Sequence, residues 1–80
     1  MSEVKQKVIS ILSDKLGIEE TEIHSESNLV NDLGMDSLDH VEITMELEKE
    51  YNIAIMDEDA EAWKVINDVV QKVESLIAEG

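Results

Sequence analysis

The chain has 80 residues, of which 20 are acidic and six are basic, and its formal net charge is −14 at pH 7. This charge repels nucleic acid and anionic membranes, argues against nucleic acid as a partner, and favours proteins that present Lys and Arg. The length allows one small domain, and the absence of cysteine excludes disulfides and thiolate metal sites. The domain must therefore fold by packing alone, against its own charge repulsion.

The first helix is predicted between Ser2, a candidate N-cap, and Gly17, a candidate stop. Apolar residues recur there at steps of three and four, as they do along one face of a helix: Val4, Val8, Ile11, Leu12 and Leu16. Charged residues interrupt the stretch, so it lacks the apolar core of a signal peptide and the roughly 20 apolar residues of a membrane span. We expect neither a targeting signal nor a span.

A long segment without sustained periodicity follows, from Gly17 to Asp36. A loop of this length is unusual in a small domain unless it is functional or pinned to the core. The apolar residues expected to pin it are Ile18, Ile23, Leu29, Val30 and Leu33.

The second helix is predicted from Asp36, whose carboxylate can accept the amide of Asp39, to Tyr51, after which Asn52 ends it. At about 100° per residue its apolar residues form two stripes on nearly opposite sides. The inner stripe is Ile43, Leu47 and Tyr51, and the outer stripe is Leu38, Val41 and Met45. Acidic residues edge the outer stripe: Asp39, Glu42, Glu46, Glu50 and Glu48. Such a surface is typical of a partner contact.

The last third of the chain predicts an extended link with Ile53 and Ile55, a short helix from Asp57, and a final helix. The final helix has a broad apolar face: Val65, Ile66, Val69, Val70, Val73, Leu76 and Ile77. Its start is left open, because Lys64 and Val65 offer no side-chain oxygen and a cap from Asn67 or Asp68 would require a later start. We expect a single all-α domain over residues 1–80, a bundle of three main helices plus one short helix with a long first loop.

Ser37 follows the predicted N-cap in the sequence D-S-L, and three roles are open to it. A nucleophile would need a base, and neither His24 in the loop nor His40 three residues later is placed for that role. Hydrolases with a similar string need an α/β core, which this chain lacks. A phosphodiester on Oγ would be stabilised by unpaired amides and the helix dipole. The residues alone leave open a plain helix-start serine and an attachment point.

No metal site is predicted. Two histidines without a third ligand do not form a zinc site. The acidic run from Asp57 fails the EF-hand pattern, because Ala62 stands where glycine is required and Asp68 stands where a bidentate glutamate is expected.

The segment DLGMDSLDHVEITMELEKEY, residues 32–51, resembles the phosphopantetheine attachment region of acyl carrier proteins of fatty acid synthesis. The segment IAIMDEDAE, residues 53–61, is similar to the part that follows the second helix in this family, and the likeness extends from about Lys5 to the final helix. The resemblance implies that Ser37 carries 4′-phosphopantetheine, transferred from coenzyme A by a separate magnesium-dependent phosphopantetheinyl transferase. The chain would be a non-catalytic carrier of growing acyl groups held as thioesters.

The resemblance also implies two sets of site residues. Residues expected to contact the basic docking patches of fatty acid synthesis enzymes are Asp36, Leu38, Asp39, Val41, Glu42, Met45 and Glu48. Residues expected to line a pocket for the acyl chain are Ile43, Leu47, Ile55, Ile66 and Val70. A carrier of this kind is expected to be cytoplasmic and monomeric.

Three positions depart from the family pattern: Lys49 stands where an acid is common, Met56 where proline is common, and Trp63 where a smaller apolar residue is usual. Lys49 could also pair with Glu46 or Glu50 as an ordinary surface charge, and Trp63 is expected in the core. The departures leave open a specialised carrier for polyketide, lipid A or D-alanyl transfer. An alternative of another class is an acidic helical interaction module in which Ser37 is unmodified.

The charge predicts a salt-dependent stability. Added salt or magnesium should raise the melting temperature, by about 4–8 °C for each kcal/mol of repulsion that is screened. Thermal unfolding followed by circular dichroism in low salt, in high salt and with magnesium measures this. An unchanged melting temperature would contradict the expectation.

Overall fold

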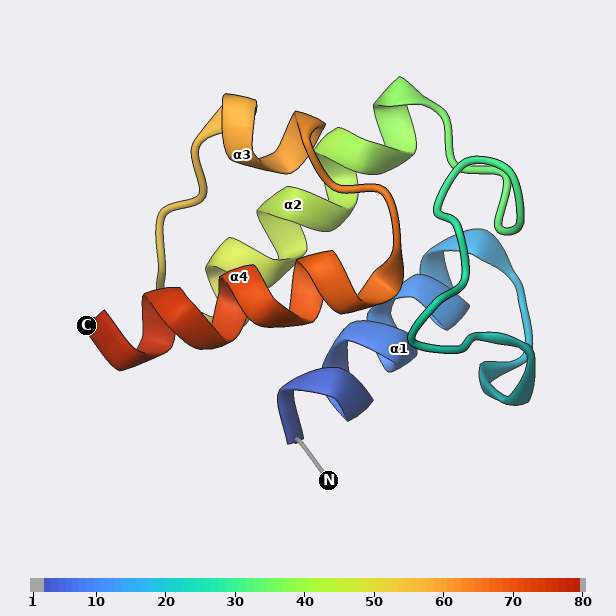
Figure 1. The fold of residues 1–80 in the computed structure, drawn as a ribbon, viewed down its shortest axis with the longest axis horizontal. Coiled ribbons are helices and arrows are strands. Elements are labelled where there is room, and N and C mark those ends of the chain that lie inside the picture. Colours follow the sequence, from blue (N-terminus) through green and yellow to red (C-terminus); the bar gives the residue numbers. More distant parts are fainter. Residues whose placement is uncertain (1–2, 80) are drawn as a thin grey trace.

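The computed structural model describes residues 3–79, and Figure 1 shows a bundle of helices. In chain order the elements are α1 (Glu3–Leu16), the 3-10 turn η1 (Glu20–Glu22), α2 (Ser37–Tyr51), α3 (Asp57–Glu61) and α4 (Ile66–Glu79). The predicted fold, three main helices and a short one with a long first loop, is confirmed. The predicted N-cap Ser2 lies outside the described residues. Over residues 3–79, no helix combines the length and the hydropathy that crossing a membrane requires.

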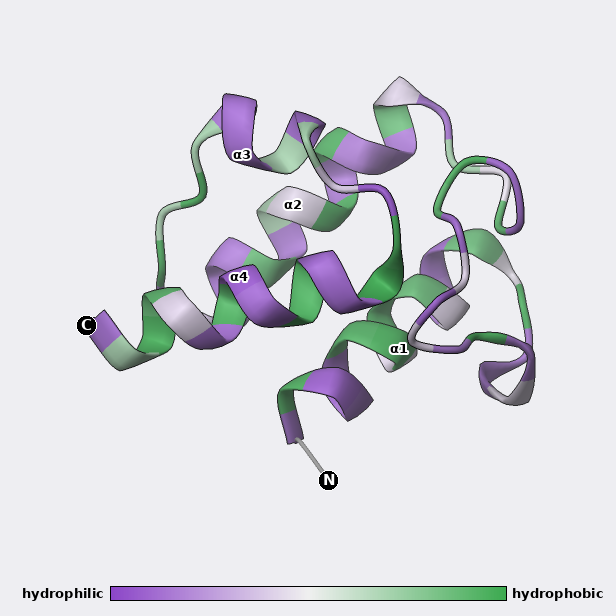
Figure 2. Ribbon diagram, viewed as in Figure 1, coloured by the Kyte–Doolittle hydropathy of each residue, from purple (hydrophilic) through white to green (hydrophobic). Residues whose placement is uncertain are grey.

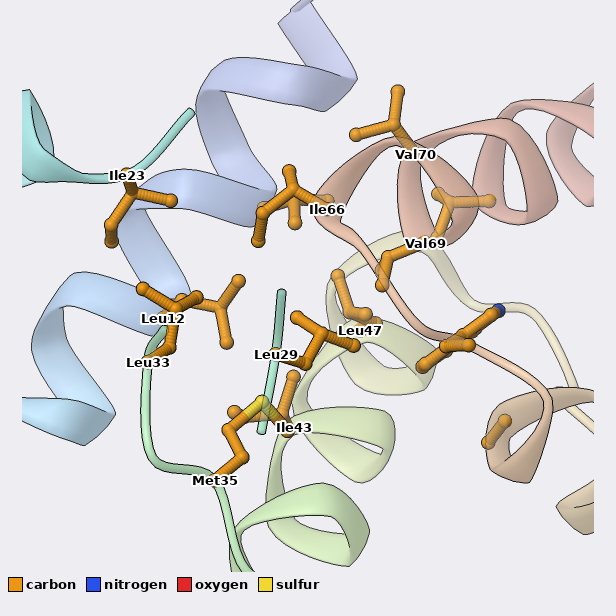
Figure 3. Close-up of a cluster of buried hydrophobic side chains, with 14 of the residues drawn as sticks. Leu12, Ile23, Leu29, Leu33, Met35, Ile43, Leu47, Ile66, Val69 and Val70 are labelled. Carbon is orange, nitrogen blue, oxygen red and sulfur yellow. The ribbon is translucent and has the colours of Figure 1, made fainter. Parts of the chain in front are cut away.

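The core forms where the apolar faces of the three long helices meet. In Figure 3 the labelled side chains of α1, α2, α4 and the long loop point toward one another. The most deeply buried core residues are Val8, Leu12, Leu29, Leu47, Ile66, Val69 and Val73. Figure 2 shows the matching alternation of hydrophobic and hydrophilic residues along α2 and α4. Each buried aliphatic side chain stabilises the fold by about 1.5–3 kcal/mol, so the bundle depends on a small number of contacts.

The long loop is pinned to this core, although not by every residue predicted. Ile23, Leu29 and Leu33 are buried and Ile18 packs against the core, as expected. Val30 is 60% exposed, so its prediction as a pin was wrong. The reason is local, because the Asn28 side chain accepts the amides of Val30 and Asn31 at 3.0 and 2.8 Å. Within this tight turn Leu29 and Leu33 face the core, and Val30 between them is left in solvent.

The same loop supplies the start of α4. The backbone carbonyls of Ser25 and Ser27 accept the amides of Asn67 and Ile66 at 2.9 and 3.2 Å. The Asp68 carboxylate accepts the amides of Lys64 and Val65 at 3.0 and 3.1 Å. The boundary that the sequence left open is therefore Ile66, where loop carbonyls satisfy amides that a helix start leaves unpaired.

The predicted helix ends are confirmed at Gly17 and Asn52, which adopt the left-handed conformation with φ of 69° and 55°. Tyr51 lies in the last turn of α2 and packs against the core. Its burial raises the pKa of the phenol, and the carboxylates of Glu50 and Glu3 raise it further. The folded chain therefore holds the phenol neutral, a contribution to stability that is lost as pH rises through the raised pKa.

Two ion pairs join α1 and α2 at the surface. Lys7 lies 3.5 Å from Glu50, and Lys15 lies 3.6 Å from Glu46. The two acids considered as partners for Lys49 therefore pair with α1 instead. Because all four side chains are substantially exposed, each pair contributes at most about 1 kcal/mol.

The contrast between buried and exposed residues of α2 predicts the effect of two truncations. Leu47 is 0% exposed, so Leu47→Ala should lower the free energy of unfolding by about 2–5 kcal/mol through lost contacts and a cavity. Met45, two residues away, is 60% exposed, and Met45→Ala should change the free energy of unfolding by less than about 0.5 kcal/mol. Urea unfolding of both variants measures the difference. Equal losses would contradict the division of α2 into an inner and an outer stripe.

Candidate functional site

Ser37 is the first residue of α2, and a capping box fixes its position. The Asp36 Oδ1 accepts the amide of Asp39 at 2.8 Å, and the Asp39 Oδ2 accepts the amide of Asp36 at 3.2 Å. Gly34, with φ of 72°, turns the chain just before this box. The predicted N-cap is confirmed, and it holds the exposed Ser37 at a defined place on the surface.

The backbone around Ser37 suits an anion better than it suits nucleophilic catalysis. Over residues 3–79, the amides of Ser37 and Leu38 have no hydrogen-bond partner, as expected for the first turn of a helix. In the same part of the chain, no hydrogen bond joins the Ser37 hydroxyl to a histidine or a carboxylate. The serine therefore has no base to activate it.

A hollow of about 440 Å³ opens beside Ser37, between α2 and α3. We call it the Ser37 hollow. Its lining residues are Ser37, His40, Val41, Thr44, Met45, Glu48, Ile55, Asp57, Ala60 and Glu61. Apolar side chains make part of the lining and carboxylates stand among them, so the hollow can receive a small apolar group while remaining open to water.

Sequence reasoning did not assign His40, Thr44, Ala60 or the α3 acids to a site. A signal was present for the α2 residues. Ser37, Val41, Thr44 and Glu48 follow one another at steps of four, three and four, which places them on one side of a helix. The contribution of α3 depends on long-range packing that no local pattern reveals.

All five predicted acyl-pocket residues belong to the buried core cluster. Ile55 also lines the Ser37 hollow, whereas four are absent from its lining: Ile43, Leu47, Ile66 and Val70. Their role as an acyl pocket stays a prediction.

The predicted partner-contact residues form an exposed apolar strip with acids beside it. Leu38, Val41 and Met45 are 64%, 55% and 60% exposed, and Glu42 is exposed next to them. Like the carboxylates of Asp36 and Asp39, that of Glu48 accepts a backbone amide, the amide of Ile55 at 2.7 Å. One predicted contact charge therefore holds the link between α2 and α3.

The carboxylates do not converge on a metal position. Within residues 3–79, no group of three or more histidine and acidic side chains is arranged to hold a metal ion. The His40 ring stacks on the ring of Trp63, so it packs within the protein. Trp63 is buried in the core, as expected.

Comparison with known families identifies the type of domain. A family profile described as a phosphopantetheine attachment site matches residues 6–73, a range that contains the capping box, Ser37 and the hollow. An acyl carrier protein of Porphyromonas gingivalis is 46% identical over 74 residues, which cover 92% of this chain and 95% of the relative. An acyl carrier protein of Amoebophilus asiaticus is 46% identical over 79 residues, which cover 99% of each chain.

A solved structure shows the same fold. A protein of Mycobacterium tuberculosis that carries the provisional description of acyl carrier protein superposes with a TM-score of 0.84. It is 32% identical, and the match covers 90% of this chain and 96% of that one.

The capping box predicts the cost of removing the N-cap. Asp36→Ala should lower the free energy of unfolding by about 1 kcal/mol and fray the turn that carries Ser37, because the Asp39 amide loses its side-chain acceptor. Glu42→Ala removes an exposed carboxylate from the next turn and should change stability by less than about 0.5 kcal/mol. Urea unfolding and amide exchange at residues 37–40 report both effects. A variant lacking Asp36 that is as stable as the Glu42 variant would contradict the role of the box.

Proposed function

Because this chain belongs to the acyl carrier proteins, the family with a phosphopantetheine attachment site, we propose that Ser37 is the residue that carries 4′-phosphopantetheine. The group supplies a terminal thiol on which acyl chains are held as thioesters, and the cysteine-free chain has no thiol of its own. The chain itself then catalyses no step. It positions the arm and presents the bound chain to separate enzymes.

One observation supports Ser37 above all: it is an exposed serine held at the first position of α2, beside a hollow of suitable size. The free amides of Ser37 and Leu38 favour a phosphodiester on the serine oxygen. The carboxylates of Asp36 and Asp39 face inward to the capping box, where each accepts a backbone amide. The residues present therefore fit the group.

The first carbons of an acyl chain would contact apolar side chains in the Ser37 hollow. Val41 and Met45 lie on its α2 side, and Ile55 and Ala60 lie on the side of the link and α3. Burial of a methylene there contributes about 0.8 kcal/mol. The hollow thus gives a bound chain partial shelter from water near its point of attachment.

We further propose that the chain serves fatty acid synthesis as a cytoplasmic monomer, since a carrier that visits many enzymes must separate from each of them. The relatives named above are acyl carrier proteins, and the resemblance of residues 32–61 is to carriers of that pathway. A specialised carrier for another acyl pathway is the alternative, and Lys49, Met56 and Trp63 are the residues that favour it.

The outer face of α2 is the proposed contact for basic partner enzymes, including the transferase that loads Ser37. Exposed carboxylates attract Lys and Arg over several ångströms, which raises the association rate more than the affinity. The apolar strip of Leu38, Val41 and Met45 is small, so the contact can release again.

Loading of Ser37 tests the proposed function. Incubation with coenzyme A, magnesium and a broad-specificity phosphopantetheinyl transferase should add one phosphopantetheinyl group to the wild type, measured as intact mass. Ser37→Ala should gain nothing, while its melting temperature stays near that of the wild type because the side chain is exposed. Loading of the Ser37→Ala variant, or no loading of a folded and unmodified wild type, would contradict the proposal.

Charge reversal on α2 tests the partner surface. Glu42→Lys should slow association with the transferase by roughly threefold or more at low salt, and the difference should shrink as salt is added. Glu79→Lys makes the same change of net charge at the far end of α4, away from Ser37 (Figure 1), and should leave the rate near that of the wild type. Stopped-flow or surface-based kinetics measure both. Equal slowing would show that net charge, not the α2 surface, steers association.

A further inference from the structure

His40 is one of the residues that line the Ser37 hollow, and it connects α2 to α3 across it. Its Nε2 lies 2.5 Å from the carbonyl oxygen of Ala60 in α3, and since a carbonyl only accepts, the nitrogen donates. Its ring stacks on Trp63, with centroids 5.7 Å apart and planes 11° from parallel. We call these two contacts the His40 bridge. The helix that begins with Ser37 is thereby joined to the helix across the hollow.

Apart from the Glu48 bond that holds the link before it, few contacts fix α3. The helix has five residues, and Met56 at its N-cap is exposed and makes no side-chain capping bond. Its only buried residue over Asp57–Glu61 is Ala60, and its ion pair with α4, Asp59 to Lys72 at 3.2 Å, is partly exposed. A single helical turn is not stable alone. The position of α3 over the hollow therefore depends strongly on the His40 bridge.

The bridge also lies between the hollow and the core. His40 lines the hollow, whereas its stacking partner Trp63 does not and is 8% exposed within the core cluster. Beyond Trp63 that cluster includes Ile66 and Val70, two residues predicted to line the acyl pocket. His40 thus touches both α3 and a member of the core cluster, and any movement of α3 away from α2 that lets an acyl chain deeper would break its bond to Ala60.

We propose that His40 determines the length of acyl chain that this carrier shields. The inference rests on the proposed attachment at Ser37. With the bridge closed, the hollow receives the first carbons of the chain, and the remaining carbons of a longer chain stay at the surface. Entry of those carbons would break the bond to Ala60 and the stack on Trp63, which opposes the gain from burying them.

The melting temperatures of the protein loaded with acyl chains of different length test the role of His40. Ser37 is loaded with butanoyl, octanoyl or hexadecanoyl phosphopantetheine in the wild type and in His40→Ala, His40→Gln and His24→Ala. The wild type should gain stability over its holo form up to octanoyl and no more beyond it. His40→Ala should gain at least about 5 °C more from octanoyl to hexadecanoyl, since the added carbons become buried. His24→Ala, which removes the exposed histidine of the loop, should behave as the wild type.

His40→Gln separates the hydrogen bond from the ring. Its amide can donate to the Ala60 carbonyl but cannot stack as imidazole does, so the limit at octanoyl should remain. Trp63, the only tryptophan, gives a second readout: its emission should shift on hexadecanoyl loading in His40→Ala and stay unchanged in the wild type.

The proposal is overturned if His40→Ala shows the same dependence on chain length as the wild type. If His40→Gln behaves as His40→Ala, the stack on Trp63 and not the bond to Ala60 sets the limit, which still supports the role of His40. Each gain is measured against the holo form of the same variant, so a general loss of stability does not imitate the effect. Intact mass reports loading before any melting is measured. A failure to load therefore contradicts the attachment at Ser37, whereas normal loading with an unchanged length dependence contradicts the role of His40 alone.

Discussion

Helix α2 packs one side into the core and leaves the other in solvent, and the proposed site depends on this division. Ile43 and Leu47 fix the rotation of the helix, because they are held among the side chains of α1, α4 and the long loop. Once that rotation is set, Ser37 faces the hollow and the outer stripe faces the solvent. The attachment point, the shelter for the acyl chain and the partner surface are thus consequences of one packing arrangement.

The many carboxylates have structural roles as well as a role in attracting partners. Asp36 and Asp39 cap α2, Glu48 accepts the amide of Ile55, and Asp68 accepts two amides ahead of α4. Each of these groups satisfies a backbone donor that a helix start or a link leaves unpaired. The carboxylates of this domain repel one another. Several of them nevertheless fix where helices begin and hold the link between α2 and α3.

The sequence predicted what depends on local pattern. The periodicity of the long helices, the cap at Asp36 and the stops at Gly17 and Asn52 are local, and the structure confirms them.

What it did not predict depends on contacts between distant segments or on a single turn. The start of α4 is set by carbonyls of Ser25 and Ser27, some forty residues earlier, and the exposure of Val30 follows from the Asn28 turn. The role of His40 in lining the hollow could not be predicted without knowing where α3 packs.

The most direct test of the account is an NMR structure of the chain with octanoyl-phosphopantetheine on Ser37. The account predicts close contacts between acyl protons and the side chains of Ile55 and Ala60, whereas an acyl chain that contacts no residue between α2 and α3 would contradict it.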